Sequence, residues 1–103
     1  MRRKIVAGNW KMNKDLNQGI DLVTEILSGT SPADVLKIIA PPFIHLAAVA
    51  EKVKGNAAFA VAAQNCHQAA NGAFTGEVSA EMIASCGTDV IISNSSADCI
   101  LTK

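Results

Sequence analysis

The sequence of 103 residues has no excess of charge of either sign, because nine Lys and Arg balance nine Asp and Glu. Non-specific binding to nucleic acid, or to an anionic membrane surface, depends on a broad electrostatic attraction that such a chain lacks. We therefore expect neither nucleic acid nor membrane as a partner. Any recognition of a charged ligand has to be local.

Long apolar runs are also missing. No segment approaches the ~20 apolar residues of a membrane-spanning helix. The basic start, Met1 to Lys4, resembles that of a signal peptide, but only residues 5–7 follow before Gly8, too few for its apolar core. Because 50% of the residues are hydrophobic and 17% are charged, the composition is typical of a soluble globular chain. We expect one cytoplasmic domain with one modest core.

Cysteine and histidine are scarce. Cys66, Cys86 and Cys99 are odd in number and are spaced by 20 and 13 residues, which fits neither a disulfide framework nor paired zinc ligands. His45 and His67 have no second ligand at metal-binding spacing. We therefore predict free thiols and no metal site.

Four short apolar runs are present, and each predicts a strand buried on both faces. They cover residues 5–7, 35–40, 58–63 and 90–92, and their starts are spaced by 30, 23 and 32 residues. Strand signals at such intervals, with helical signals between them, are typical of right-handed βαβ units in a parallel sheet. We expect neighbouring parallel strands in sequential order, with the helices on one outer face.

Helical signals fill the three intervals. In the first, apolar residues at 16, 20, 23 and 27 fall on one face. The second interval repeats this pattern more weakly at 46, 49, 50 and 53, and Gly55 and Asn56 close it. The third predicted helix is short, with Ser79 as its cap, Glu81 in its first turn and Gly87 at its end. The fold class is therefore α/β, in the order β-α-β-α-β-α-β.

In parallel α/β folds, the loops after the carboxyl ends of the strands carry binding and catalysis. Here these loops begin at Gly8, Pro41, Gln64 and Ser93, and three of the four bear hydrogen-bonding side chains. Lys11 is the only cation close behind a strand end. Its ammonium could hold an anionic substrate or stabilise an oxyanion, although lysines are more often simply solvated.

The neighbours of Lys11 have structural interpretations as well. Asn9 could bond to the backbone of its own loop as an Asx turn. Trp10 is more often a packing residue than a ligand contact.

Two stretches resemble the triosephosphate isomerase family in residue identity, spacing and position relative to the predicted strands. They are IVAGNWKMNK (residues 5–14) and AAQNCHQAANGAFTGEVSAEMI (residues 62–83). The resemblance extends from Arg3 to Ile92. It implies that residues 1–92 form the amino-terminal part, about half, of a (β/α)₈ TIM barrel. Residues 93–103 form a divergent tail.

The resemblance also implies an activity. Members of the family are intramolecular aldose-ketose isomerases that interconvert dihydroxyacetone phosphate and glyceraldehyde 3-phosphate in glycolysis and gluconeogenesis. The resemblance implies that the reaction uses no cofactor and no metal. Asn9 and Lys11 match its substrate-binding positions, with Lys11 near the carbonyl and phosphate oxygens.

A homodimer interface is implied by further positions. Gln64, Asn65 and the loop that contains Thr75 and Glu77 resemble the family's protruding third loop, which docks into a second subunit. Thr75 is expected at the contact. An ordinary surface loop is the alternative, but the length of this one favours a functional role.

The family's fourth strand ends in Gly-His-Ser-Glu-Arg-Arg, whereas here the aligned residues run from Ser93 to Asp98 and the histidine position is Asn94. An asparagine amide can donate a hydrogen bond to a carbonyl but cannot give up and recover a proton at neutral pH. The family's catalytic base, a glutamate, belongs to its second half, which this sequence does not contain. The same holds for the loop that closes over the active site and for the phosphate-binding loops.

We therefore expect the chain alone to be inactive. The alternative function is that of a non-catalytic interaction module, or pseudoenzyme, that pairs with a full-length subunit or a complementary half-barrel. A truncated or frame-altered gene and a divergent shortened paralogue both account for the tail.

Overall fold

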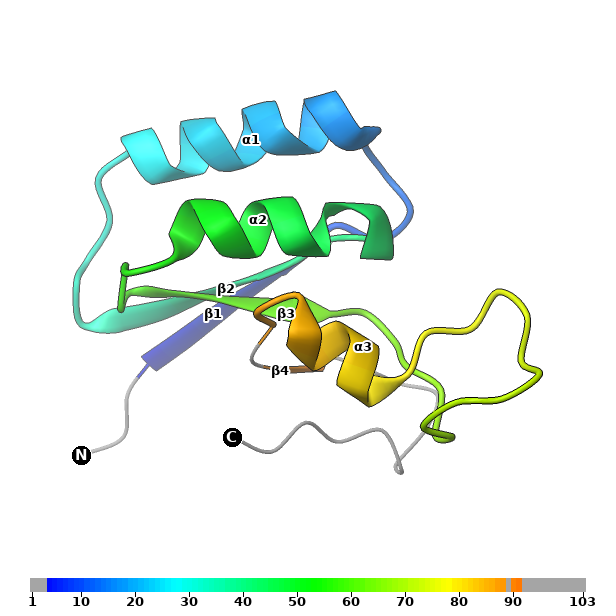
Figure 1. The fold of residues 1–103 in the computed structure, drawn as a ribbon. Coiled ribbons are helices and arrows are strands. Elements are labelled where there is room, and N and C mark those ends of the chain that lie inside the picture. The colour runs from blue at the N-terminus through cyan, green and yellow to red at the C-terminus, as the bar shows by residue number, and fades with distance from the viewer. Residues whose placement is uncertain (1–3, 89, 92–103) are drawn as a thin grey trace.

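A computed structural model describes residues 4–88 and 90–91. Four strands alternate with three α-helices and one 3₁₀ helix (Figure 1). The strands are β1 (Lys4–Asn9), β2 (Val35–Ala40), β3 (Phe59–Ala63) and β4 (Val90–Ile91). The helices are α1 (Leu16–Ser28), η1 (Phe43–His45), α2 (Leu46–Val53) and α3 (Ala80–Ser85). No helix in this described part of the chain is long and apolar enough to cross a membrane.

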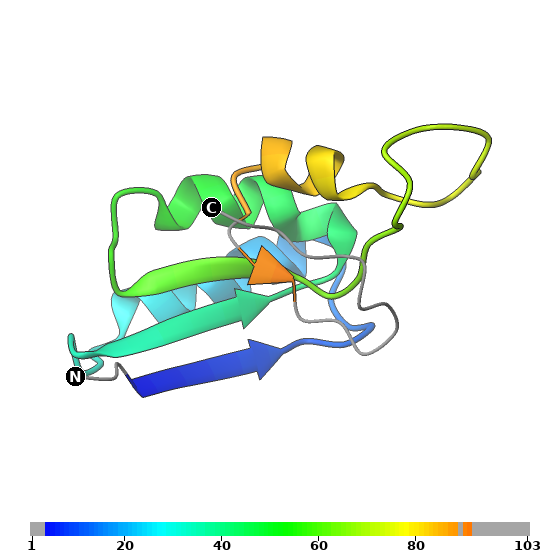
Figure 2. The same ribbon diagram turned by 90° about the horizontal axis from the view of Figure 1, so that it is seen from below.

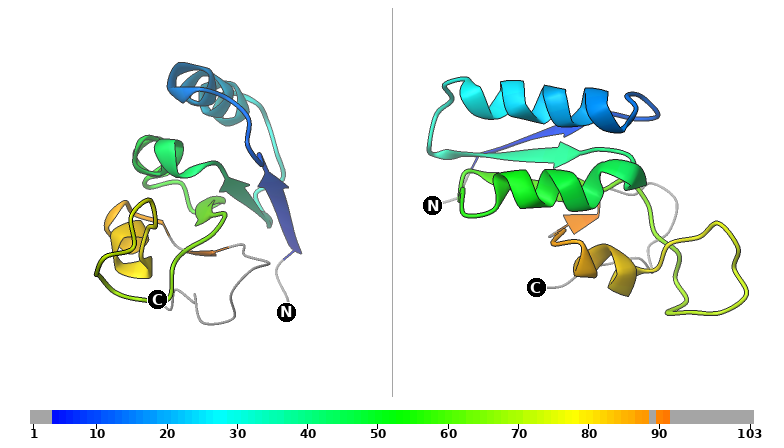
Figure 3. Two further views of the ribbon diagram at one scale, coloured as in Figure 1. Left: turned by 90° about the vertical axis from the view of Figure 1, so that its right-hand side faces the viewer. Right: turned by 45° about the horizontal axis from the view of Figure 1, so that its top comes forward.

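The strands form one parallel sheet in the order β1-β2-β3-β4. Asn9 pairs with Ala40 at the carboxyl end of β1, and Ala62 pairs with Val90 between β3 and β4. Figure 2 shows the arrowheads pointing the same way, and Figure 3 shows the sheet curling with the three α-helices on its outer face. The predicted order, direction and one-sided helix layer are confirmed.

Side-chain and backbone caps explain where the helices begin and end. Ser79 Oγ accepts from the Met82 amide at 3.2 Å and starts α3. Gly87, at a φ of +88°, follows the end of α3, and Gly55, at +83°, follows the end of α2. Such left-handed positions favour glycine. The predicted start and end of α3 and the predicted end of α2 are therefore confirmed.

The start of α1 is fixed by a pair of hydrogen bonds between two side chains and the backbone. Asp15 Oδ1 accepts from the Gln18 amide at 2.8 Å, and Gln18 Oε1 accepts from the Asp15 amide at 3.0 Å. This reciprocal pair is a capping box. It fixes the residue at which the loop after β1 ends.

The core lies between the outer face of the sheet and the helices. Its buried members come from β2, β3, all three α-helices and the segment after β3. They are Val23, Ile39, Leu46, Val49, Val53, Val61, Ala63, Cys66 and Ile83.

Burial of β1 departs from the prediction. Every residue of this strand is exposed, including Ile5 at 58% and Val6 at 61%. Among the described strands, β1 pairs with β2 alone and forms the edge of the sheet. The apolar run correctly predicts a strand, but it does not show whether neighbours cover both faces. The prediction of burial on both faces is therefore wrong for β1.

The cysteines also require a correction. Cys86 is a free, half-buried thiol, whereas the buried Cys66 is disulfide-bonded. Cys99 lies outside the described residues. Spacing along the sequence does not show which sulfur atoms meet in the fold, because a disulfide requires proximity in space. The prediction of free thiols is wrong for Cys66.

Candidate active site at the carboxyl ends of the strands

Three loops that are distant in sequence meet where β1, β2 and β3 end. The Trp10 amide donates to the Ala40 carbonyl at 3.0 Å, which continues the pairing of β1 with β2 by one residue. The Gln64 side-chain Nε2 donates to the same Ala40 carbonyl at 2.8 Å and to the Lys11 carbonyl at 3.0 Å. The loops after the first three strands therefore meet at one end of the sheet, called the rim below, as expected where parallel strands end together.

Lys11 is held in an unusual backbone conformation at this rim. Its φ is +57°, in the left-handed region, which costs a non-glycine residue about 1–2 kcal/mol. The Lys11 amide donates to Asn9 Oδ1 at 2.8 Å, and the Lys11 carbonyl accepts from Gln64. Hydrogen bonds on both sides of the residue therefore stabilise this conformation.

The Asx-turn interpretation of Asn9 is confirmed by this bond. Because the side-chain oxygen of Asn9 is used within the loop, its amide NH₂ is the group left to face a ligand. Trp10 is half-buried against the core, as a packing residue should be.

The Lys11 ammonium has no carboxylate partner in residues 4–88 and 90–91. The one ion pair within 4 Å there joins His67 Nδ1 to Glu77 Oε2, at 3.9 Å. A small pocket opens beside Lys11. It is lined by Lys11, Met12, Pro42, Phe43, Gln64 and Asn65. An exposed, unpaired ammonium beside a pocket is suited to binding an anionic group.

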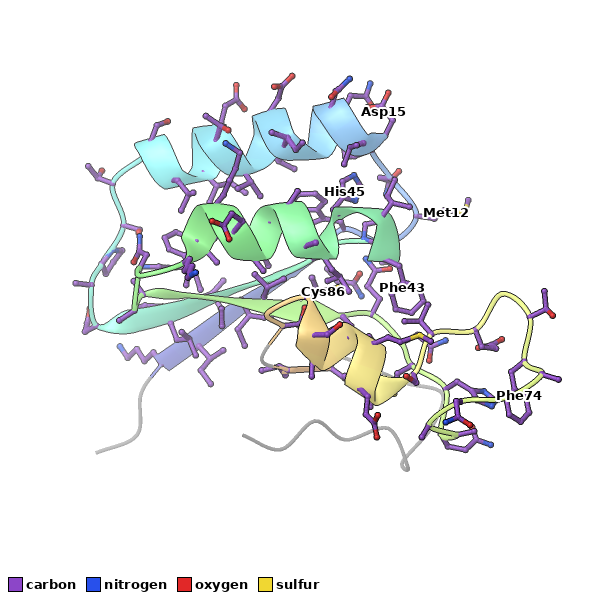
Figure 4. The ribbon with its side chains drawn as sticks, in the orientation of Figure 1. Met12, Asp15, Phe43, His45, Phe74 and Cys86 are labelled. Carbon is purple, nitrogen blue, oxygen red and sulfur yellow. The ribbon has the colours of Figure 1, made fainter. Side chains whose placement is uncertain are left out.

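A buried histidine lies beneath this loop. His45 is 0% exposed, and its ring meets the Trp10 ring edge-on, with the centroids 5.5 Å apart. His45 Nε2 lies 2.7 Å from the Asp15 carbonyl oxygen. Figure 4 shows the ring between the beginnings of α1 and α2. The sequence offered no signal for this contact, because 30 residues separate its partners.

The protruding loop, residues 67–79, is closed at its base and packed inside. The His67 amide donates to the Val78 carbonyl at 2.8 Å, and the His67 ring lies 4.3 Å from that of Phe74, centroid to centroid. Thr75 and Glu77 are exposed on this loop, which extends away from the sheet (Figure 1). Within the chain, Gln64 therefore contacts Lys11, whereas Thr75 and Glu77 belong to a separate projecting surface.

The remaining predicted site residue, Asn94, lies outside the described residues, as does the loop of which it is part. In the part of the chain that the structure describes, no three His, Cys, Asp or Glu side chains come together as metal ligands.

A curled parallel sheet of βαβ units, with its strands in sequential order and its helices on the outer face, is the arrangement found in part of a (β/α)-barrel. The family model for triosephosphate isomerase matches residues 4–97. This chain belongs to the triosephosphate isomerase family, and its fold is part of that family's barrel.

Curated proteins with similar sequences are triosephosphate isomerases as well. The triosephosphate isomerase of Phocaeicola vulgatus is 51% identical over 96 residues, and that of Cytophaga hutchinsonii is 45% identical over 95. The Flavobacterium johnsoniae enzyme is 46% identical over 93 residues. Each alignment covers 89% of this chain and 37% of the relative. The chain thus spans little more than a third of the length of these relatives.

Proposed function

We propose that this chain provides the substrate-binding part of a triosephosphate isomerase site, which interconverts dihydroxyacetone phosphate and glyceraldehyde 3-phosphate in cytoplasmic glycolysis. In this proposal, Lys11 binds the carbonyl and phosphate oxygens, and the amide NH₂ of Asn9 donates a further hydrogen bond. One observation carries the proposal. The rim places an ammonium without a carboxylate partner, among the described residues, on a backbone held by Asn9 and Gln64.

Electrostatics explain why this geometry suits a triose phosphate. The substrate is a dianion, and its carbonyl oxygen gains negative charge when the neighbouring carbon loses a proton. A cation already held in place stabilises that charge without further reorganisation. Because the left-handed conformation of Lys11 is fixed before a ligand arrives, binding requires less ordering of this loop.

Isomerisation additionally needs a base for the carbon-bound proton and a group that relays a proton between the two oxygens. Asp15, the carboxylate nearest to Lys11 in sequence, is engaged in capping α1. In this proposal, position 94 corresponds to the family's histidine and holds an asparagine, which cannot relay protons. Loss of a positioned acid or base costs about 10²–10⁴ in rate. We therefore propose that a polypeptide of these 103 residues binds triose phosphates without turning them over.

We further propose that the protruding loop docks onto a second subunit, with Thr75 at the contact and with Glu77, Gln64 and Asn65 in the interface. Exposed apolar side chains support this proposal. Phe74 on the loop is 47% exposed, and Met12 beside the rim is 94% exposed. Figure 4 shows Met12 and Phe43 at the end of the molecule from which the loop projects. A second copy of the chain is the proposed partner.

A non-catalytic interaction module is the second candidate. The exposed edge strand β1, with Ile5 and Val6 uncovered, favours it, because such edges pair readily with other strands. In that case the partner is a full-length subunit or a complementary half-barrel.

Binding of glycerol 3-phosphate, a three-carbon phosphate that cannot isomerise, tests the first candidate. Titration into the purified chain should give saturable binding that Lys11→Ala weakens by at least about tenfold, as expected on loss of a charged contact. Lys52→Ala, at an exposed position on α2, is the matched control and should bind as the unmodified chain does. Equal affinity in Lys11→Ala would contradict the proposed site.

A further inference from the structure

The segment between Trp10 and Asp15 carries two strained residues. Lys11 has a φ of +57° and Lys14 a φ of +77°. Both are non-glycine residues in the left-handed region, which L side chains disfavour. Such a segment relaxes unless the surrounding structure holds it at both ends.

One side chain contacts both ends of this segment. The His45 ring packs edge-on against the Trp10 ring, and its Nε2 lies 2.7 Å from the Asp15 carbonyl oxygen. Because a carbonyl oxygen only accepts, Nε2 carries the proton and donates it to Asp15. The tautomer of His45 is therefore fixed by its position in the fold.

The helix above provides the space for this ring. Gly19 lies in α1 directly over His45, and a Cβ at that position would overlap the ring atoms Cδ2 and Nε2. His45 Nδ1, on the opposite side of the ring, is buried and has no hydrogen-bond partner among the described residues. The histidine thus uses one nitrogen, for Asp15, and its ring, for Trp10.

We propose that His45 is a positioning residue for Lys11. It touches no ligand, and it acts through Trp10 and Asp15 to keep the intervening loop in the conformation that presents the ammonium at the rim. This proposal rests on the function proposed above for its link to substrate binding, whereas its structural part concerns the loop itself. If His45 only filled space in the core, an apolar ring of similar size would serve equally well.

Amide hydrogen exchange can separate these two roles without any ligand. The amide to follow is that of Lys11, which donates to Asn9 Oδ1, and the reference is the Lys37 amide, which donates to the Ala58 carbonyl between β2 and β3. His45→Phe keeps an aromatic ring against Trp10 but removes the donor to Asp15. We expect Lys11 exchange to accelerate about five- to tenfold relative to Lys37, as expected for loss of one neutral hydrogen bond.

Rescue and control variants sharpen the test. His45→Gln replaces the ring donor with an amide NH₂ of similar reach and should restore most of the protection of Lys11. Thr24→Val removes a different side-chain donor to a backbone carbonyl, that of Ile20 within α1, and should leave Lys11 unchanged. Gly19→Ala should displace the His45 ring and accelerate Lys11 exchange although His45 is present. This last variant tests the proposal even if His45→Phe fails to fold.

Two results would overturn the proposal. One is unchanged exchange at Lys11 in both His45→Phe and Gly19→Ala. The other is acceleration in equal proportion at Lys11 and Lys37, which indicates a general loss of stability.

Glycerol 3-phosphate affinity, measured on the same variants, separates this proposal from the proposed function. If His45 positions Lys11 for substrate, affinity should fall with Lys11 protection in His45→Phe and return in His45→Gln. If the unmodified chain does not bind glycerol 3-phosphate but Lys11 exchange responds as expected, the substrate site is wrong and the role of His45 in the loop stands.

Discussion

The side-chain amide of Gln64 donates to the backbone carbonyl of Lys11 at 3.0 Å, across 53 residues of sequence. Through a second bond to the Ala40 carbonyl at 2.8 Å, the same nitrogen joins the loops after β1 and β3 to the last residue of β2. One half-buried side chain thereby connects the three strand ends that the sequence places in separate βαβ units. The position of Lys11 at the rim therefore depends on contacts that form only when the three strands have assembled into the sheet.

Removal of the Gln64 side-chain amide should destabilise the fold at the rim. We predict that Gln64→Ala lowers the free energy of unfolding by about 1–3 kcal/mol, because two backbone carbonyls lose a partner. Gln64→Glu should cost at least as much, since a carboxylate would face two carbonyl oxygens. Urea denaturation measures both variants, with Gln68→Ala at a nearby exposed position as the control. A Gln64→Ala variant as stable as Gln68→Ala would show that these bonds contribute nothing.

The two glycines of the protruding loop should respond differently to alanine. Gly76, at a φ of +88°, has no atom within 4 Å of an added Cβ, so Gly76→Ala should cost only the backbone strain of about 1–2 kcal/mol. At Gly72, with a φ of +133°, an added Cβ would lie 2.9 Å from the Phe74 ring. Gly72→Ala should therefore also displace Phe74.

Urea denaturation and exchange of the Glu77 amide, which donates to the Phe74 carbonyl at 3.0 Å, can separate these variants. We expect Gly72→Ala to speed Glu77 exchange more than Gly76→Ala does. Equal effects would mean that the packing of Phe74 against Gly72 does not shape the loop.

The docking proposal makes Thr75 a position at which bulk and charge should prevent association. We predict that Thr75→Arg weakens self-association by more than about tenfold, the effect typical of a residue at the centre of an interface. Sedimentation velocity over a range of concentrations gives the measurement. Thr30→Arg, at an exposed position between α1 and β2, provides the control. A chain that is monomeric at every concentration, with Thr75 unmodified, would count against docking.

Local signals in the sequence predict most of the fold. Apolar runs mark the strands, and Ser79, Gly55 and Gly87 mark helix boundaries, because capping and left-handed turns depend on a few adjacent residues. The capping box of Asp15 and Gln18 likewise depends on two residues three positions apart, so the start of α1 is also encoded locally.

Contacts between units were not predictable in the same way. Nothing near Gln64 in the sequence shows that its amide reaches Lys11, and nothing near His45 shows that its ring lies under Trp10. The exposure of β1 and the bonding of Cys66 likewise depend on which segments become neighbours in space. The assignments of Asn9 and Lys11 to substrate, and of Asn94 to the histidine position, came from a family resemblance and stay predictions.

Turnover of dihydroxyacetone phosphate by the purified 103-residue chain, followed in a coupled assay free of contaminating isomerase, decides whether these residues carry a complete isomerase site. We predict no rate above the uncatalysed reaction, and no rescue by Asn94→His, because among the described residues no carboxylate lies within 4 Å of the Lys11 ammonium and Asp15 is engaged in capping α1. Turnover that disappears in Lys11→Ala would contradict this view and show that the chain carries a complete site.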